Sequence, residues 1–561
     1  MRLRLILLLV LAAIAALPAT AGAADVPAGA TWSEATIPSS DGVQLHADIL
    51  RPKQLAKTDK TPVILSIGPY FNHSGQTGPA GPVEGTSYDP VGPSTGPSDR
   101  FTDFVEGAHL MEKGYTFVMV DLRGFGGSTG CLDWGGPGEQ SDVVAAVQWA
   151  AAQSWSTGKV GMYGKSYDGV TGLIGVNKQP AGLKAVVSQE PVYDLYRYLY
   201  GDGMRRANAF LTPALYDLID ATPGPIADDP SYNVNGADDT QRPGCLAANY
   251  ADQAANDDHY SPYWRARNLI PGATGSTVPL FLTQGLTENN TVADGTAQYL
   301  QNHPGYERAW LGPWEHVRGN ERDDSGRLKM GRAGWFDETM RFYDRFLKGT
   351  APTVADPPVA VQTNDGKWRS EKSWPPADSK GYTTTLRTGS YTDDGEANAT
   401  GPGAEKGVWT ISKPLAHDVH LSGSGSAVVD VSTSLPDANL VLDVYDLDVS
   451  GTGPLITRQG HLVRNSGPVS LDLWSADWKI PAGHRIGVKV ADSNGDWWAH
   501  VPTKQTVTIH GGSISLPFLP APRRTGTIQG DPGTQLASYL ADTVNVPQGT
   551  IDASESAFAT P

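Results

Sequence analysis

Residues 159–169, Lys-Val-Gly-Met-Tyr-Gly-Lys-Ser-Tyr-Asp-Gly, contain the serine best placed for nucleophilic chemistry. An apolar run ends in Gly164, Ser166 follows two positions later, and small residues suited to a helix come next. A tight strand-to-helix turn of this kind exposes the serine hydroxyl and points a helix N-terminus at the reaction centre. Asp168 makes the stretch differ from the common G-x-S-x-G pattern. We therefore expect Ser166 to be a nucleophile that needs a base, an acid and oxyanion donors.

The base should be a histidine in a loop after the last main strand of the same sheet. Residues 306–311 predict a strand, and His316 follows it in the sequence Gly-Pro-Trp-Glu-His. Of the 12 histidines, His316 is the one with this place in the predicted order of elements. His46, His109 and His303 lie in predicted strands or helices, so we expect them at the surface.

The acid should follow the preceding strand, which residues 278–283 predict. Glu288 is the first carboxylate beyond this strand, where a loop can reach the far nitrogen of His316. Asp294 comes later and is explained more simply as the N-cap of the next helix, although it stays an alternative acid. The sequence thus predicts the chain order serine, acid, histidine, which this topology requires.

The oxyanion of an acyl-transfer reaction needs two hydrogen-bond donors. The backbone N–H of Tyr167, directly after Ser166, is one candidate. The hydroxyl of Tyr70 is the other, because Tyr70 lies in the loop after the strand predicted at 61–67. The alternative is that Tyr70 is a packed aromatic residue with no catalytic role.

Strands and helices alternate between residues 60 and 190, as parallel β-α units do. A hairpin at 32–51 precedes them, and an insertion at 192–270 follows, where it would cover the carboxyl ends of the strands. Continuous apolar runs indicate strands that are buried on both faces. The expected strands are 61–67, 115–122, 160–163, 183–188, 278–283 and 306–311, and the expected helices are 101–113, 139–151 and 335–347.

After about residue 375, helical periods end and short alternating runs separated by turn residues begin. We expect an α/β catalytic domain at 25–375 and an all-β sandwich or jelly roll at 376–520. Residues 521–561 are rich in Pro, Gly and Ala and predict a loosely held tail with one short helix at 536–539.

Residues 1–24 have the features of a secretory signal, namely Arg2 and Arg4, an apolar run at 5–17 and an Ala-Gly-Ala cleavage pattern at 21–23. The apolar run is too short to span a bilayer comfortably. The formal net charge of −17 argues against nucleic acids and anionic membranes as partners. We expect a secreted, extracellular protein without membrane attachment after signal cleavage; an uncleaved anchor is the alternative.

Cys131 and Cys245 are the only cysteines of the chain. In an exported protein two cysteines are expected to pair, and this disulfide would tie the insertion to a loop near the mouth of the site. A metal site would need histidines at ligand spacing, and a catalytic cysteine would need an elbow-like turn; the sequence around them has neither. The chemistry predicted above requires no metal or organic cofactor.

Seven motifs, one of them around Ser166, form a wider pattern. They are Gly-Pro-Tyr at 68–70, Asp-Leu-Arg-Gly-Phe-Gly-Gly-Ser at 121–128, the stretch 158–169 around the serine, Gly-Leu-Thr-Glu-Asn-Asn-Thr-Val at 285–292, Gly-Pro-Trp-Glu-His at 312–316, Arg-Phe-Tyr-Asp-Arg-Phe-Leu-Lys-Gly at 341–349 and Pro-Ala-Gly-His-Arg-Ile at 481–486. With them the chain resembles the cocaine esterase and Xaa-Pro dipeptidyl-peptidase (S15-type) serine hydrolases, a branch of the α/β-hydrolases. The resemblance covers nearly all of the chain after the signal, and the family's elbow reads G-x-S-Y-x-G, so Asp168 fits it.

The resemblance implies Ser166 as the nucleophile and His316 as the base, with the Tyr70 hydroxyl and the Tyr167 N–H forming the oxyanion hole. The usual acid of the family is Asp, and the matching position here is Glu288. The implied fold is an α/β-hydrolase core with a helical cap, followed by a galactose-binding-like jelly roll that helps to wall the site.

We expect a secreted serine hydrolase that cleaves short peptides through an acyl-enzyme, as a Xaa-Pro dipeptidyl-peptidase does. A carboxylesterase or an α-amino-acid ester hydrolase or acylase of the cocaine esterase type is the alternative, with a small ester as substrate. A dipeptidyl-peptidase needs a carboxylate that binds the free amino terminus, and Glu190, Asp194 and Asp202 are available for this. An alternative from another class is a non-catalytic carbohydrate-binding protein with Trp497 and Trp498 as stacking platforms, although such aromatics are more often buried.

Overall fold

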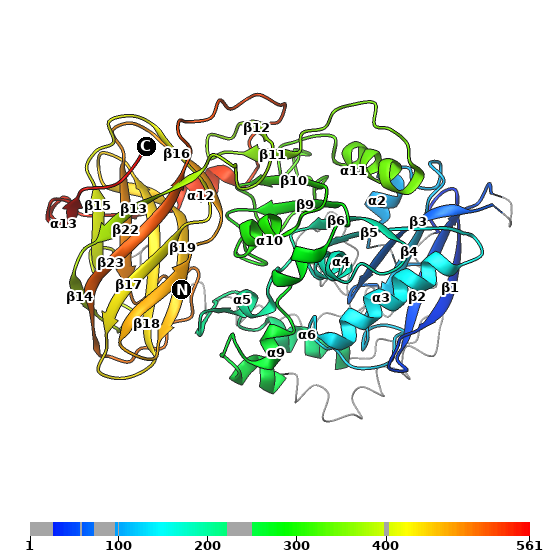
Figure 1. The fold of residues 1–561 in the computed structure, drawn as a ribbon, viewed down its shortest axis with the longest axis horizontal. Coiled ribbons are helices and arrows are strands. Elements are labelled where there is room, and N and C mark those ends of the chain that lie inside the picture. The colour runs from blue at the N-terminus through cyan, green and yellow to red at the C-terminus, as the bar shows by residue number, and fades with distance from the viewer. Residues whose placement is uncertain (1–25, 56–58, 72–95, 99, 222–249, 398–402) are drawn as a thin grey trace.

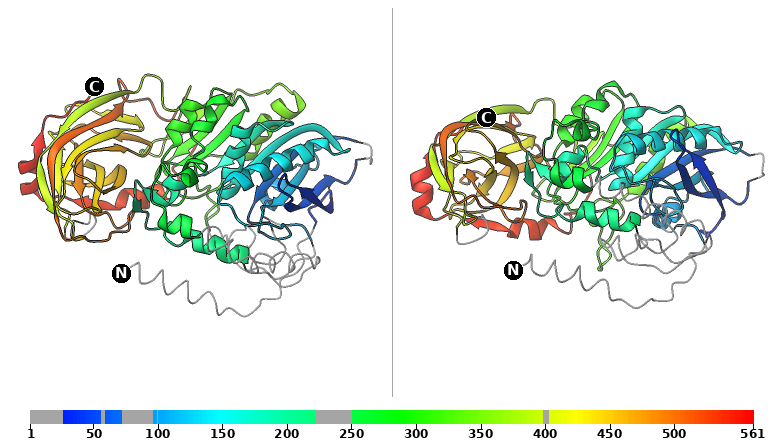
Figure 2. Two further views of the ribbon diagram at one scale, coloured as in Figure 1. Left: turned by 60° about the horizontal axis from the view of Figure 1, so that its bottom comes forward. Right: turned by 90° about the horizontal axis from the view of Figure 1, so that it is seen from below.

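The computed structural model describes residues 26–55, 59–71, 96–98, 100–221, 250–397 and 403–561. These residues form an α/β part and a β part that lie side by side, with the C-terminus at the β part (Figures 1 and 2). The predicted signal at 1–24 falls outside the described residues. The predicted disulfide is half described: Cys131 is disulfide-bonded, and Cys245 lies outside the described residues, so the pairing of the two stays a prediction.

A ten-stranded sheet forms the centre of the α/β part, with the order β1-β2-β4-β3-β5-β6-β9-β10-β11-β12. The strands from β4 to β11 in this order run parallel, and β1, β2 and β12 pair antiparallel with their neighbours. The bounds are β1 Ala30–Pro38, β2 Gln44–Pro52, β3 Thr61–Gly68, β4 Thr116–Asp121, β5 Ser156–Lys165, β6 Leu183–Gln189, β9 Leu280–Gly285, β10 Glu307–Gly312, β11 Val359–Gln362 and β12 Trp368–Glu371.

The predicted hairpin and the six predicted parallel strands are all present in this sheet. Buried side chains alternate between its two faces: Val63 and Leu65 of β3 belong to one apolar cluster, and Ile64 belongs to another. A strand covered on both faces needs a continuous apolar run, and this signal made the inner strands predictable. The strands β11 and β12 at the sheet edge were not predicted: each has four residues, the apolar run of β11 is only Val-Ala-Val, and β12 has none.

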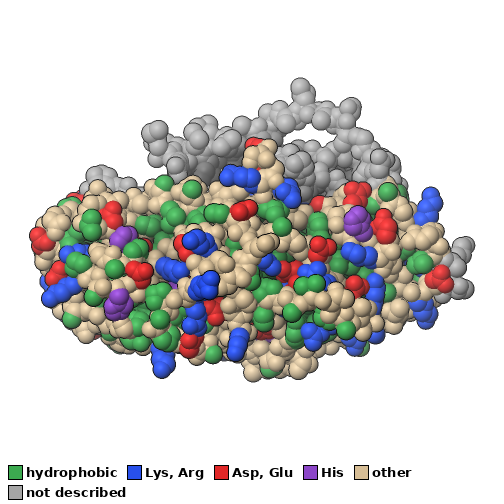
Figure 3. All heavy atoms as spheres, turned by 90° about the horizontal axis from the view of Figure 1, so that it is seen from above, with side chains coloured by type: hydrophobic (Ala, Val, Ile, Leu, Met, Phe, Trp, Pro, Cys, Tyr) green, Lys and Arg blue, Asp and Glu red, His purple; other side chains and the backbone are tan. Residues whose placement is uncertain are grey.

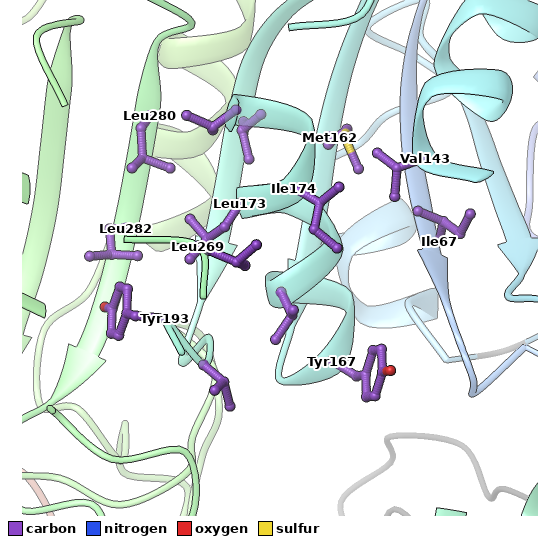
Figure 4. Packing of buried hydrophobic residues seen from close by; sticks show 14 of the residues in the cluster. Ile67, Val143, Met162, Tyr167, Leu173, Ile174, Tyr193, Leu269, Leu280 and Leu282 are labelled. Atoms are coloured by element: carbon purple, nitrogen blue, oxygen red, sulfur yellow. The ribbon is translucent and has the colours of Figure 1, made fainter. Parts of the chain in front are cut away.

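Helices cover both faces of the sheet: α3 (Pro137–Ala152) and α4 (Tyr167–Lys178) pack on one, and α2 (Thr102–Gly107), α11 (Trp335–Tyr343) and the π-helical turn Asp344–Lys348 on the other. Figure 4 shows Leu173 and Ile174 of α4 within the first cluster, with Tyr167 at the N-terminal end of the helix. The helix predicted at 101–113 is shorter than expected. It ends at Gly107, and His109 adopts a positive φ of 55° that an α-helix cannot contain.

The segment between β6 and β9 carries the insertion. Its described elements are α5 Leu195–Leu199, β7 Tyr200–Gly201, β8 Met204–Arg205, α6 Thr212–Ala221, α9 Pro262–Arg265 and the 3-10 turn Pro271–Gly275. The Tyr216 hydroxyl of α6 hydrogen-bonds the Tyr70 hydroxyl in the loop after β3. This contact brings the insertion to the carboxyl ends of the parallel strands, where open α/β sheets bind their ligands.

Two sheets packed face to face make up the β part, and their strands pair antiparallel except for β25, which runs parallel to β15. One contains β13 Lys380–Leu386, β14 Gly389–Thr392, β16 Val419–Gly423, β17 Ser426–Ser432, β20 Gly467–Asp472, β21 Ala476–Ile480 and β23 Thr506–Phe518. The other contains β15 Val408–Ser412, β18 Ala438–Leu447, β19 Thr452–Val463, β22 Arg485–Ala491, β24 Thr543–Asn545 and β25 Glu555–Ser556. A buried apolar cluster fills the space between them, so this region is β-rich, as its alternating sequence predicts.

The expectation of a loosely held tail is wrong. Strand β24 pairs with β19, and β25 pairs with β15. The helices α12 (Leu536–Ala541) and α13 (Gln548–Ser554) lie beside them, and Val546 and Ile551 are buried. A few apolar side chains in an otherwise polar segment are enough to hold it. The short helix predicted at 536–539 is present as α12.

Acidic and basic side chains are interspersed on the face shown in Figure 3. His46 and His303 were expected at the surface, and this is wrong: both are buried because carboxylates bind them, Glu34 and Asp121 for His46 and Glu307 for His303. Among the described residues, no helix combines the length and apolar character that a membrane crossing needs.

Candidate active site

Ser166 lies at the junction of β5 and α4 in a strained backbone conformation, with φ 66° and ψ −125°. Its N–H donates to the Gln189 carbonyl at 2.9 Å, which holds the turn against β6. Gly164 is required for this turn, because a Cβ there would come within 2.3 Å of the Asp168 carbonyl oxygen. Side-chain-bearing residues rarely adopt a positive φ, and such strain is common where a side chain must be presented for function.

Glu288 and His316 come together from neighbouring strands. Gly285 at the end of β9 pairs with Gly312 at the end of β10, so the loops after both strands start side by side. The Glu288 carboxylate is fully buried, and its Oε1 lies 2.5 Å from His316 Nδ1. The same carboxylate accepts hydrogen bonds from the N–H (3.0 Å) and hydroxyl (2.9 Å) of Thr291.

Asp294, the alternative acid, is turned away from His316. Its Oδ1 binds Arg197 Nη1 at 2.7 Å, and its Oδ2 accepts a hydrogen bond from Gln459 of the β part at 3.3 Å. Its expected role as an N-cap is also wrong, because helix α10 (Thr296–Asn302) begins after Gly295. Between the two acids considered, Glu288 is the one in contact with the histidine.

The surroundings of His316 favour its neutral form, chiefly through burial. Burial lowers the pKa of His316, and the nearby Lys165 ammonium lowers it further. Lys165 Nζ also donates to the His316 backbone carbonyl at 2.8 Å and so fixes the histidine loop. The Glu288 carboxyl keeps a pKa below its ordinary value: burial opposes this, but His316 and the hydrogen bonds from Glu190 and the Thr291 N–H together outweigh burial. A neutral imidazole held by an ionised carboxylate is the resting form of a general base.

Tyr70 directs its hydroxyl to the elbow. The group is buried, lies within hydrogen-bonding reach of the Ser166 hydroxyl and bonds the Tyr216 hydroxyl. Burial raises the pKa of Tyr70 to about 12, so it stays a protonated donor. The Arg100 guanidinium stacks on its ring at 3.7 Å and is held there by Asp168 Oδ2 at 2.9 Å. Asp168, the residue that departs from the common elbow pattern, thus supports the tyrosine.

Ser166 Oγ makes no hydrogen bond to His316 in the described structure; its neighbour is the Tyr70 hydroxyl. Of the two imidazole nitrogens, Nδ1 is occupied by Glu288, so Nε2 is the one available to a serine proton. Catalytic hydrogen bonds are often long or absent before substrate binds.

Aromatic side chains surround the turn that carries Ser166. The Tyr216 ring lies 5.4 Å from both Tyr167 and Trp134, and Trp134 lies 6.2 Å from Tyr198. Tyr167 is the first residue of α4, and its hydroxyl donates to the buried Glu139 carboxyl at 2.8 Å. The walls beside the nucleophile are therefore mostly apolar, as in pockets that bind small organic groups.

The three acids proposed for binding a substrate amine are all engaged elsewhere. Asp194 is buried and binds His259 at 2.7 Å. Asp202 pairs with His461 of the β part. Glu190 is buried behind Glu288 and accepts hydrogen bonds from Trp314 and the Gly285 N–H. In the described part of the chain, none of these three carboxylates is free to bind an ammonium group.

Sequence reasoning missed several residues that shape the site. Lys165 could have been found, since it adjoins the nucleophile. Arg100 and Gln535 could not, because they reach Tyr70 and the Glu315 N–H from distant segments. Trp498 is buried and Trp497 stacks on Arg458 at 3.5 Å, which leaves little ring surface for a sugar.

Two groups of side chains have the composition of cation ligands: Glu34, His46 and Asp48, and Asp393, Asp492 and His500. In each group the histidine Nε2 already binds a carboxylate, Glu34 at 2.9 Å and Asp393 at 2.6 Å. These contacts use the donor atoms that a metal would need. We assign no cofactor to either group.

Known proteins match both parts of the chain. The family model of X-Pro dipeptidyl-peptidase (S15 family) matches residues 41–318, and the model of the X-Pro dipeptidyl-peptidase C-terminal non-catalytic domain matches residues 353–537. The chain belongs to this family of serine hydrolases. The first model covers most of the α/β part, and the second covers β11, β12 and most of the β part.

Relatives of this family carry different names. A putative Xaa-Pro dipeptidyl-peptidase of Streptomyces avermitilis is 26% identical over 447 residues, which are 72% of this chain and 61% of that protein. Cocaine esterase of a Rhodococcus species is 28% identical over 435 residues, 72% of this chain and 69% of that protein. The crystal structure of a CocE/NonD family hydrolase from Staphylococcus aureus has a TM-score of 0.64 at 17% identity, covering 87% of this chain and 93% of that one. The match in structure supports the same fold, with a catalytic part and a separate β-rich part.

Proposed function

We propose that the chain hydrolyses carboxylic ester or peptide bonds through an acyl-enzyme on Ser166. The observation that carries this proposal is the 2.5 Å contact between Glu288 Oε1 and His316 Nδ1 beside a strained serine turn. His316 Nε2 takes the Ser166 proton as the hydroxyl attacks the substrate carbonyl, then returns it to the leaving group. Glu288 orients the imidazole and stabilises the imidazolium that forms.

The negative charge that develops on the substrate oxygen needs donors that are fixed in advance. The Tyr70 hydroxyl and the Tyr167 N–H are our assignment for these donors, since the hydroxyl reaches Ser166 from the loop after β3 and Tyr167 directly follows the serine. Water then attacks the acyl-enzyme with His316 again as the base. The core would be an α/β-hydrolase and the β part a jelly roll.

For the substrate, the described site favours an acyl group without a charged amine. Aromatic rings line the nucleophile turn, and Glu190, Asp194 and Asp202 are occupied. An ammonium group buried without a carboxylate would be strongly unfavourable. A carboxylic ester with an apolar acyl group is therefore the first candidate.

A Xaa-Pro dipeptidyl-peptidase activity is the second candidate, and the family description favours it. We further propose that the protein is exported by the signal at 1–24, loses membrane contact on cleavage, and pairs Cys131 with Cys245.

A substrate panel tests both candidates. Purified protein would be given Ala-Pro anilide, amino-acid esters and short aryl esters, with Ser166→Ala as the control. Aryl ester turnover well above anilide turnover supports the first candidate, and the reverse supports the second. Equal turnover by Ser166→Ala, or no labelling of the wild type by a fluorophosphonate, contradicts the hydrolase mechanism itself and favours a binding protein.

A further inference from the structure

A second glutamate lies directly behind the proposed acid. Glu190 follows β6, Glu288 follows the neighbouring strand β9, and the Glu190 N–H donates to the Thr283 carbonyl at 2.9 Å. Glu190 is fully buried and has a positive φ of 46°, which side-chain-bearing residues seldom adopt. The two carboxyl groups are within hydrogen-bonding reach of each other. A strained backbone thus holds a second acid against the first.

Four donors surround the Glu190 carboxyl. Trp314 Nε1 (3.0 Å) and the Thr283 hydroxyl (3.1 Å) donate to Oε1, and the Gly285 N–H (2.7 Å) and Gln284 Nε2 (3.3 Å) lie against Oε2. Gln284 Nε2 is also 3.1 Å from Glu288 Oε2, so one amide bridges both acids. Trp314 belongs to the histidine loop, and the Glu190 carboxyl therefore joins the ends of β6, β9 and β10.

The cations near the pair act on Glu288: Lys165 and Arg206 both interact electrostatically with it. Within the described chain, no Lys, Arg or His forms an ion pair with Glu190, whereas Glu288 binds His316. Two adjacent buried carboxylates cannot both ionise at neutral pH, so one of them keeps a proton. Glu288 has the imidazole and the two Thr291 donors, which favour its charged form.

A protonated Glu190 fits these neighbours. Its carbonyl oxygen Oε1 would accept from Trp314 and Thr283. Its hydroxyl oxygen Oε2 would accept from the Gly285 N–H and donate to the Glu288 carboxylate, with Gln284 Nε2 against both acids. Burial, together with the charge of Glu288, raises the pKa of Glu190 well above its ordinary value, in agreement with this arrangement.

We propose that Glu190 is a positioning residue that stays protonated and holds Glu288 by a carboxylic acid hydrogen bond. This inference rests on the proposed function. The hydrogen bond fixes Glu288 Oε2 and leaves Oε1 for His316 Nδ1. It also keeps the total charge of the two acids at minus one, so that the pKa of His316 is not raised by a second negative charge.

The pH profile of Glu190→Gln separates this role from a merely structural one. The glutamine is neutral like the proposed acid, but it cannot reproduce both the donation to Glu288 and the acceptance from Gly285. We expect kcat/KM to fall about tenfold, the loss of one well-placed hydrogen bond. We expect the midpoint of the acid limb, which reports His316, to stay within about 0.3 unit of the wild type.

Either of two results would overturn the proposal. A midpoint lower by about one unit or more would mean that Glu190 is ionised in the wild type, because its removal then removes a nearby negative charge. A kcat/KM within twofold of the wild type would show that Glu190 does not position Glu288. Asp443→Asn is the matched control, since Asp443 is a fully buried acid of the β part bound by Asn494 and Tyr445. It should change neither quantity.

Infrared spectroscopy of the wild type keeps the test valid if Glu190→Gln does not fold. With isotope-labelled glutamate at about pH 9, Glu139 and Glu315, whose pKa values are raised to about 7, are ionised. A remaining labelled carboxylic acid band is expected from Glu190, and its absence would overturn the proposal. This band does not depend on turnover. A wild type that shows the band but gives the same turnover as Ser166→Ala would therefore contradict the proposed function and leave the role of Glu190 standing.

Discussion

His316 in the α/β part and His420 in the β part each bind a fully buried carboxylate, Glu288 at 2.5 Å and Asp477 at 3.1 Å. We call the second pair closed, because both imidazole nitrogens and both carboxylate oxygens have protein partners. His420 uses Nε2 for Asp477 and accepts the Arg523 N–H on Nδ1 at 3.1 Å. Asp477 also binds both terminal nitrogens of Arg369, at 2.7 and 2.6 Å. Every strong donor and acceptor of this cluster is occupied.

The first pair is open by comparison. His316 uses one ring nitrogen, and its side chain keeps 20% exposure. The acid behind it, Glu288, has a second acid as neighbour, and among the described residues no arginine forms an ion pair with it. Burial would raise the pKa of Asp477, but Arg369 and His420 hold it far below its ordinary range. The difference shows when a histidine–carboxylate contact indicates catalysis. One imidazole nitrogen must remain available to a substrate or nucleophile, and the carboxylate must not be neutralised by an arginine.

Removing the charge of Glu288 should break the open pair most severely. Glu288→Gln is expected to lower kcat by about 10³–10⁴-fold, because the amide cannot stabilise the imidazolium and can favour the wrong tautomer. Turnover of a reactive aryl ester measures the effect, and the melting temperature checks the fold. Glu288→Asp is the control, since it keeps the charge and should lose far less. A Glu288→Gln loss below tenfold would contradict the assignment of this acid.

Breaking the closed pair should instead cost stability. Asp477→Asn leaves Arg369 and His420 buried without their counter-charge and is expected to destabilise the fold by about 3–5 kcal/mol. Denaturant unfolding measures this, and Asp430→Asn on the exposed side of β17 is the control, with an expected change below about 0.5 kcal/mol. Fluorophosphonate labelling of the folded variant should keep the wild-type rate. If Asp477→Asn is stable but is labelled slowly, the His420–Asp477 pair affects catalysis, and the contrast between the two pairs is wrong.

A third histidine tests the same distinction through pH. Burial alone would lower the pKa of His46, but hydrogen bonds from its ring to Asp121 and Glu34 raise it to about 10. A raised folded pKa contributes stability below the unfolded value of about 6.5, and this contribution is lost as pH rises towards 10.

His46→Gln should therefore be less stable than the wild type by about 1–3 kcal/mol near pH 6, with the gap closing by pH 10; the range is modest because Glu34 is partly exposed and screened. His109→Gln, an exposed change, should show no gap at either pH. A gap that widens with pH would show that His46 is neutral in the native state.

The sequence predicted the features that depend on local residue patterns and on the order of the elements. Apolar runs identified the parallel strands, and the order of elements singled out Ser166, Glu288 and His316 from their places after β5, β9 and β10. Contacts between distant segments had no such signal. Nothing near Glu190 indicates that it meets Glu288, because the meeting depends on how β6 and β9 pair. The burial of His46 by Glu34 and Asp121 was hidden for the same reason, and so was the packing of the tail.

That packed tail brings the β part to the open pair and gives the smallest expected effect. Gln535, just before α12, accepts the Glu315 N–H on its side-chain oxygen at 2.9 Å, and Glu315 directly precedes His316. Gln535→Ala removes this single hydrogen bond, worth about 1 kcal/mol, so kcat/KM should fall about three- to tenfold with a nearly unchanged melting temperature. Gln548→Ala, which removes an exposed bond to Asp552 in α13, is the control and should leave both unchanged. If Gln535→Ala lowers the melting temperature without lowering kcat/KM, the tail supports the fold and not the histidine loop, and the open pair depends on the α/β part alone.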